Sequence, residues 1–275
     1  MTTTTAPTTS TTTSADGTTI AFETTGRGPA LVLVDGALCS RTMGPSGDLS
    51  AQLADRFTVV RYDRRGRGGS GAGSSPYAVG REVEDLLAVL AAVGGHAHVL
   101  GISSGAALAL EAARGGAPID RLAVFEAPFI LDDTHPANDP LLPERVQELV
   151  DRGRRGQAVA TFLRTVGAPA PMVLLMRLTP VWRKLTAVAH TLPYDLSIVV
   201  PFEQGEPLPD GYYDAVAVPT LVLAGGRSPA YMRSSQAAIA DALTGGRLDV
   251  LPRQTHMVKA AVLAPVVADF LTSTS

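Results

Sequence analysis

Short, largely apolar runs alternate along this chain with segments in which apolar residues recur at helical spacing. The runs are Ala30–Val34, Phe57–Tyr62, Ala97–Ile102, Arg121–Phe125, Thr220–Ala224 and Leu248–Leu251. A strand that is covered on both faces has such a continuous apolar run, and parallel strands are joined by crossovers that are usually helices. The alternation therefore predicts an α/β fold with a mostly parallel sheet and helices on both of its faces.

Helical patterns lie between most of these strands. They cover Met43–Arg56, where a loop comes first, and Val79–Val93, Ser104–Arg114, Tyr231–Leu243 and Val258–Leu271. Gly94 and Gly95 end the second of these helices, as glycine commonly does at a helix C-terminus. Before the first apolar run, Thr18–Glu23 alternates in character, and this pattern predicts a strand at the edge of the sheet.

The alternation breaks between residues 131 and 217. This segment has helical patterns at Leu142–Arg154, Gln157–Val166 and Met172–His190, but no clear core strand. We therefore expect a helical cap over 131–217, inserted into a core formed by 15–130 and 218–275. Because ligands of open α/β sheets bind outside the carboxyl ends of the strands, an insertion that leaves from such an end is expected to cover the site.

The first fourteen residues contain nine threonines and no apolar segment. With nothing to bury, residues 1–14 are predicted to be a disordered tail, and they lack the basic and apolar regions of a secretory signal. No apolar run reaches the roughly 18 residues of a membrane span. Cys39 is the single cysteine, so no internal disulfide is possible, and we expect a cytoplasmic protein.

The overall charge is −3, and no basic stripe indicates a nucleic-acid partner. Gly66-x-Gly68 does not precede a dinucleotide-binding helix, and no cluster has metal-ligand spacing, so we expect no cofactor and no metal. The expected partner is a small-molecule substrate. The sequence leaves the oligomeric state open.

Gly101-Ile102-Ser103-Ser104-Gly105 has the pattern G-x-S-x-G between a predicted strand and a predicted helix. In that context the serine sits on a sharp turn that exposes its hydroxyl above the sheet, and the helix N-terminus favours negative charge nearby. The alternative is a serine in an ordinary strand-to-helix turn. We predict Ser103 as a nucleophile and the backbone N–H of Ser104 as one oxyanion donor.

These residues resemble the α/β-hydrolase superfamily, close to small bacterial esterases and cofactor-free haloperoxidase-type hydrolases. Matching features are Asp35-Gly36 after a strand, the segment Tyr62–Ser70, the turn at Ser103, and His256 near the C-terminus. The resemblance covers about residues 18–271. It implies an eight-stranded sheet and acyl transfer by a Ser-acid-His triad.

His256 follows the last predicted strand, where the base of this superfamily lies. Histidine titrates near neutrality and can accept the proton of a serine hydroxyl. The acid of such enzymes usually follows the strand Thr220–Ala224, but Arg227 stands in that stretch. Glu126 follows the preceding strand, and the order Ser103, Glu126, His256 matches that of hydrolases. Glu126 is therefore predicted as the acid, with an anchor for the insertion, or a Ser-His dyad, as alternatives.

The second oxyanion donor is expected in the loop after Val34, and Ala37 is the predicted residue. Asp35 occupies a position at which the superfamily often has histidine. A carboxylate there would oppose the negative charge of an oxyanion, so Asp35 either points away, binds a substrate hydroxyl or acts as an acid or base. Met172, Leu175, Met176, Trp182 and Tyr194 of the cap are predicted to contact substrate, or else to form the cap's own core.

Three classes of function fit this sequence. The first is a serine hydrolase that cleaves an ester, lactone or thioester of a small to medium apolar substrate through an acyl-enzyme on Ser103. The second is a lyase, isomerase or cyclase that uses Ser103, His256 and Asp35 as acid-base groups, because one fold supports many reactions. The third is a binding protein with an inactive site, against which the presence of both Ser103 and His256 argues.

Overall fold

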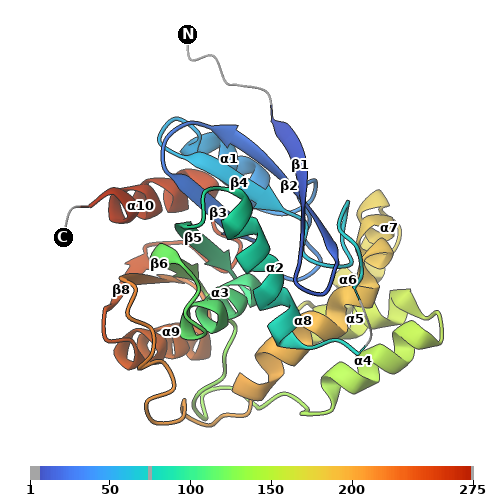
Figure 1. Cartoon of the computed structure of the whole chain (residues 1–275). Helices are drawn as coiled ribbons and strands as arrows, with labels where there is room; N and C mark the ends of the chain where they lie inside the picture. The colour runs from blue at the N-terminus through green and yellow to red at the C-terminus, as the bar shows by residue number, and fades with distance from the viewer. Residues whose placement is uncertain (1–6, 74–75, 274–275) are drawn as a thin grey trace.

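The computed structural model describes residues 7–73 and 76–273, and Figure 1 shows their arrangement. Eight strands form one sheet in the order β1-β2-β4-β3-β5-β6-β7-β8. Their bounds are β1 Thr8–Thr13, β2 Thr19–Gly26, β3 Ala30–Val34, β4 Thr58–Tyr62, β5 Ala97–Ile102, β6 Ile119–Phe125, β7 Thr220–Gly225 and β8 Gly246–Leu251. Only the pairs β1–β2 and β2–β4 are antiparallel. The expected α/β-hydrolase fold with a mostly parallel eight-stranded sheet is confirmed.

The strand β1 corrects two predictions. Residues Thr8–Thr13, assigned to a disordered tail, pair with β2 from Thr8 opposite Thr24 to Thr13 opposite Thr19. The β-branched threonine favours extended backbone, and an unpaired sheet edge offers it hydrogen bonds without any apolar burial. β2 is consequently an inner strand rather than the edge strand that was predicted. Residues 1–6 of the predicted tail lie outside the described residues.

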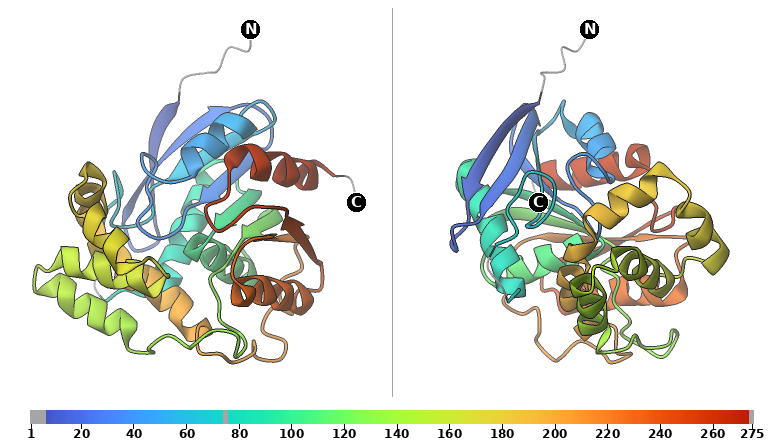
Figure 2. Two further views of the ribbon diagram at one scale, coloured as in Figure 1. Left: turned by 180° about the vertical axis from the view of Figure 1, so that it is seen from behind. Right: turned by 90° about the vertical axis from the view of Figure 1, so that its right-hand side faces the viewer.

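Helices cover both faces of the sheet (Figures 1 and 2). α1 (Ser46–Leu53) and α10 (Ala260–Thr272) pack on one face, where Leu49, Leu53 and Leu263 join the apolar core. α2 (Val79–Ala92), α3 (Ser104–Arg114) and α9 (Ala230–Ala242) pack on the other face. These helices lie close to their predicted bounds, because burial of one apolar stripe fixes each of them. No helix among the described residues has the length and apolar character needed to cross a membrane.

The segment between β6 and β7 is helical, and we call residues 131–217 the insertion. It contains α4 Leu142–Asp151, α5 Arg155–Thr165, α6 Ala170–Met176, α7 Pro180–Ala187 and α8 Leu192–Val199, with short 3₁₀ turns at Ala189–Thr191 and Val200–Phe202. The single helical pattern predicted over Met172–His190 is split, because Pro180 cannot donate a backbone hydrogen bond in a helix interior and starts α7 instead. Figure 1 places these helices together, beside one end of the sheet.

The order of the strands in the sheet determines where a binding site is expected. The chain runs from β3 to β4 on one side and then returns to β5 on the other side of β3. Such a reversal opens a crevice outside the carboxyl ends of the two neighbouring strands. The loop after β3 and the turn after β5 meet there, and the insertion leaves the sheet from the adjacent strand β6.

Candidate active site

Ser103 occupies the sharp turn between β5 and α3. Its φ of 58° and ψ of −127° lie outside the helical and strand regions, and its backbone N–H donates to the carbonyl of Phe125 at 2.9 Å. Neighbouring backbone comes very close, since a Cβ at Gly36 would lie 2.9 Å from the Cβ of Ser103 and one at Gly105 only 2.1 Å from the carbonyl oxygen of Val34. Glycine is required at both positions, and the serine hydroxyl is left at the surface of a cavity.

His256 and Glu126 complete a hydrogen-bonded relay with Ser103. His256 lies in the loop between β8 and α10, and its Nε2 is 3.2 Å from the Oγ of Ser103. Its Nδ1 is 2.8 Å from the Oε2 of Glu126. A carboxylate only accepts, so Nδ1 carries the hydrogen and Nε2 is free to accept the serine proton. The three predicted residues are therefore brought together at hydrogen-bonding distances.

Glu126 follows β6 and is fully buried. Its second oxygen, Oε1, accepts the backbone N–H of Gly225 at 2.7 Å, at the end of β7. The end of β7, where the resemblance would place the acid, thus supplies a backbone donor to Glu126 at the end of the neighbouring strand β6. Arg227, two residues further, is exposed at the rim of the cavity and does not take the place of the acid.

Backbone strain is concentrated around these residues. Among the described residues, the non-glycine residues with positive φ are Leu38, Ser103, Glu126 and Arg253. Leu38 lies in the loop after β3, and Arg253 lies three residues before His256. Each such residue costs about 1–3 kcal/mol and persists only where the surroundings fix it, and such residues cluster at active sites. The strain therefore marks the same site as the hydrogen bonds do.

Ala37 and Ser104, the two predicted oxyanion donors, lie beside Ser103 and have backbone N–H groups without an internal acceptor among the described residues. Both residues line the cavity. Their N–H groups are left unpaired because Ala37 lies in a loop and Ser104 in the first turn of α3. Both predicted oxyanion donors are thus available to a ligand.

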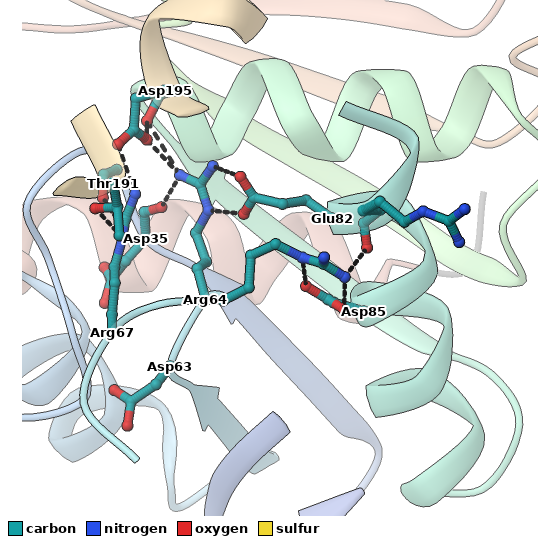
Figure 3. A network of polar contacts seen from close by, with 12 residues as sticks. Asp35, Asp63, Arg64, Arg67, Glu82, Asp85, Thr191 and Asp195 are labelled. Carbon is teal, nitrogen blue, oxygen red and sulfur yellow. Dashed lines mark hydrogen bonds and ion pairs between the residues drawn. The ribbon is translucent and has the colours of Figure 1, made fainter. Parts of the chain in front are cut away.

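A buried arginine network holds the loop that carries Ala37 (Figure 3). Arg67 donates to the carbonyls of Gly36 at 2.7 Å and Cys39 at 3.3 Å, and Arg64 donates to that of Asp35 at 3.2 Å. Both guanidinium groups are also bound by Asp195 of α8, at 2.7 Å for Arg64 and 2.5 Å for Arg67. The insertion is thereby tied to the loop that carries Ala37.

Asp195 balances charge in this network. Burial alone would raise the pKa of its carboxyl, but Arg67 and Arg64 outweigh burial and hold the pKa below its usual range. Its Oδ1 also accepts the hydroxyl of Ser104 at 2.7 Å. Arg64 is bound on its other side by Glu82, at 2.6 and 2.8 Å. The arginines after β4 are consequently paired inside the protein rather than available to a phosphate.

Asp35 is buried away from the cavity that Ser103 faces. Burial raises the pKa of its carboxyl to about 6, although the charge of Arg67 acts in the opposite direction. Figure 3 shows its side chain within the arginine network. The structure does not support the prediction that Asp35 contacts substrate, because the side chain is buried and Ala37, not Asp35, lines the cavity.

The cavity above Ser103 has a volume of about 270 Å³. The strand ends form its floor, with Ser103 and His256, and the insertion forms most of its roof. The apolar part of its wall includes Ile130, Phe162, Val166, Leu196, Val199 and Met232. Polar or charged side chains that were not predicted as contacts also line it, among them His135, Asn138, Asp195, Glu203 and Tyr231.

The predicted substrate contacts of the insertion lie elsewhere. Met172 and Leu175 are exposed on α6, and Met176 does not reach the cavity. Trp182 packs beside Gly156 and under Arg177, and Tyr194 stacks on Tyr77 at 4.2 Å. The periodicity of short, irregular helices does not indicate which of their faces lines a cavity. Large apolar side chains in such helices are therefore poor predictors of substrate contacts. The side chains in the cavity come instead from α5, α8 and the loops beside them.

The described part of the chain contains no group of three His, Cys, Asp or Glu side chains that could hold a metal ion.

Residues 33–266 match the profile of the alpha/beta hydrolase family. A crystal structure of an alpha/beta hydrolase from Sphaerobacter thermophilus is 46% identical, with 96% of this chain and 100% of that chain covered and a TM-score of 0.87.

Two further structures are similar at lower identity. A hydrolase from Pseudomonas aeruginosa is 26% identical, with 98% and 100% of the two chains covered and a TM-score of 0.72. A thermophilic esterase from Thermogutta terrifontis is 22% identical, with 96% of each chain covered and a TM-score of 0.68, a likeness that concerns the fold.

Proposed function

Because this chain belongs to the alpha/beta hydrolase family, we propose that it is a serine hydrolase that cleaves an ester, lactone or thioester of a small to medium apolar substrate. Family membership and the similar hydrolases support hydrolase activity in general. The observation that carries the finer proposal is the relay from Glu126 through His256 to Ser103, at 2.8 and 3.2 Å, on the floor of a largely apolar cavity.

In the proposed reaction, the Oγ of Ser103 attacks the substrate carbonyl carbon while the Nε2 of His256 takes the hydroxyl proton. The backbone N–H groups of Ala37 and Ser104 hold the resulting oxyanion. Collapse of this intermediate breaks the bond to the leaving oxygen or sulfur, which receives the proton from His256. Glu126 orients the imidazole and stabilises its charged form.

Water completes the cycle. His256 takes a proton from a water molecule, whose oxygen attacks the carbonyl carbon of the acyl-enzyme. The second intermediate collapses, the bond to the Oγ of Ser103 breaks, and His256 returns the proton to the serine. The products are a carboxylic acid and an alcohol or thiol, which for a lactone belong to one molecule.

The cavity supports the proposed size and polarity of the substrate. Its volume of about 270 Å³ and its apolar wall suit an acyl or alcohol chain of moderate length. The alternative of a lyase, isomerase or cyclase was motivated by Asp35 as an extra acid-base group and by a missing acid. Asp35 does not line the cavity and Glu126 contacts His256, so neither observation now favours that alternative.

The test is turnover of a panel of p-nitrophenyl esters, lactones and acyl thioesters by the wild type, Ser103→Ala and His256→Ala. We expect the wild type to hydrolyse at least one class, and each variant to lose about 10³-fold or more in kcat. Circular dichroism of the variants verifies that they are folded. A folded wild type that hydrolyses no member of the panel would contradict the proposal.

A further inference from the structure

Glu203 is a buried carboxylate that faces the cavity and has no role in the relay. It follows α8 at the end of the turn Val200–Phe202, and only 6% of its surface is exposed. Its Oε2 accepts the side-chain N–H of Asn138 at 2.7 Å, and Asn138 lines the same cavity. A polar pair is therefore built into the part of the wall that the insertion supplies.

Most other buried carboxylates differ from Glu203 in having a basic partner. These pairs are Asp63 with Arg41, Glu82 with Arg64, Asp85 with Arg65, Asp195 with Arg64 and Arg67, and Glu126 with His256. Among the described residues, only Asp35 and Glu203 are buried carboxylates without an ion pair. Asp35 does not line the cavity, whereas Glu203 does.

One oxygen of Glu203 is available to a ligand. Its Oε1 has no hydrogen-bond partner among the described residues and is not enclosed by protein. Burial raises the pKa of this carboxyl to about 7, with the hydrogen bond from Asn138 acting in the opposite direction. A buried polar group without its partner is costly, and a bound donor would relieve that cost.

The pair lines the same cavity as Ser103 and His256 of the relay. Burial raises the pKa of the Tyr231 phenol, and the nearby charges of Glu203 and Glu126 both add to this rise. The side chain of Tyr231 lines the same cavity as Glu203. A single substrate of moderate length can reach from Ser103 to Glu203 within one cavity.

We propose that Glu203 and Asn138 form a subsite that selects substrates with a hydrogen-bond donor, a hydroxyl or an ammonium group, remote from the bond that is cleaved. This inference rests on the proposed hydrolase function and narrows its substrate class. The apolar wall binds the chain of the substrate, and the Oε1 of Glu203 accepts the hydrogen bond of its terminal group. A substrate with a purely apolar end leaves that oxygen unpaired.

The test measures the binding of three small ligands to the full-length protein by ligand-observed NMR titration. Hexan-1-ol and 1-methoxypentane are isomers, of which only the alcohol donates a hydrogen bond, and hexylamine supplies an ammonium group. We expect hexan-1-ol, hexylamine or both to bind about tenfold more tightly than 1-methoxypentane. Equal affinities for all three ligands would overturn the inference without the need for any variant.

Variants identify the group responsible. Glu203→Met keeps the approximate shape but has no acceptor oxygen, and we expect it to abolish the preference. Glu203→Gln keeps an acceptor but has no charge. Loss of hexylamine binding in this variant would show that an ammonium group needs the charged carboxylate, and retained hexan-1-ol binding would show that a hydroxyl needs only an acceptor oxygen. Glu206→Gln, on the exposed surface three residues away, is the matched control and should retain the preference. A preference that persists in folded Glu203→Met would contradict the inference.

These ligands contain no ester, so their binding is independent of Ser103 chemistry. Selective binding without ester turnover would contradict only the proposed hydrolase function. Ester turnover without selective binding would contradict only the subsite.

Discussion

The floor and the roof of the cavity differ in how their polar groups are paired. On the floor, Glu126 is fully buried and each of its oxygens accepts a hydrogen bond, from His256 and from the backbone of Gly225. In the roof, Glu203 has one free oxygen. Farther out, α7 buries none of its residues, and Leu178 before it is 83% exposed. The fixed floor suits chemistry that many substrates share, and the open roof suits discrimination among substrates.

Asp195 joins these two regions. It belongs to α8 of the insertion, yet its carboxylate binds Arg64 and Arg67, which donate to carbonyls of the loop that carries Ala37. Because of this contact, we expect the stability of the floor to depend on α8. The helices α6 and α7 lie farther out, and we expect the floor to depend on them less. Substitutions should therefore have effects that decrease from the relay, through this contact, to the outer surface.

Glu126→Gln should have the largest effect. The amide cannot stabilise the charged imidazole as a carboxylate does, so we expect kcat for an ester substrate to fall by about 10³–10⁴-fold. Glu148→Gln on the exposed face of α4 is the matched control and should leave kcat unchanged. A loss of less than about tenfold would show that Ser103 and His256 work as a dyad. Catalysis would then depend less on the hydrogen bond between Glu126 and His256 than the geometry indicates.

Asp195→Ala should have the next largest effect, now on stability. It leaves Arg67 and one side of Arg64 buried without their countercharge, which typically costs about 3–5 kcal/mol in the free energy of unfolding. Urea denaturation of this variant beside Asp210→Ala, an exposed aspartate of the insertion, measures the difference. If both variants are equally stable, the contact does not join the insertion to the floor.

Glu203→Gln should have a smaller effect that depends on pH. The pKa of Glu203 is raised in the folded protein to about 7 from 4.5, so the folded state binds more protons than the unfolded state between these values. Wild-type stability is therefore expected to fall, relative to the variant, as pH rises from 4.5 to 7, by roughly 1–3 kcal/mol. Below pH 4.5 the two proteins should be about equally stable.

Thermal or urea unfolding at several pH values measures the difference in unfolding free energy between the two proteins. Both proteins contain Asp35, so the effect of its titration cancels in this difference. A wild type that instead gains stability relative to Glu203→Gln above pH 7 would mean that the carboxylate has a cationic partner in the folded state.

Leu178→Gln should have the smallest effect. Its side chain is 83% exposed in the turn between α6 and α7, and surface substitutions of this kind usually change stability by less than about 0.5 kcal/mol. We expect the melting temperature and ester kcat to stay near those of the wild type. A large loss of either would show that this outer part of the roof is coupled to the floor.

The core was predictable because its strands are buried on both faces. Ala30–Val34, Ala97–Ile102 and the helix Ser104–Arg114 have the predicted bounds. Continuous apolar runs and the glycines of the Ser103 turn depend on local sequence, so they are visible without a structure. Glu126 also followed from the chain, since it comes directly after a recognisable strand.

The roof was not predictable in the same way. Glu203 and Asn138 lie in irregular segments, and only the fold brings them together, at a sequence separation of 65 residues. The role of Asp195 was likewise hidden, because its partners Arg64 and Arg67 are distant in sequence and the pairing needs the packed position of α8. The strand Thr8–Thr13 was missed because it gains hydrogen bonds rather than apolar burial.

Labelling of Ser103 by a fluorophosphonate, observed by intact-protein mass spectrometry, tests the central claim most directly. We expect one adduct on the wild type and none on Ser103→Ala, because only a serine activated by His256 attacks the phosphorus readily. Ser103 lines the cavity together with His256. A folded wild type that forms no adduct, or a Ser103→Ala variant that still forms one, would contradict the assignment of Ser103 as the nucleophile.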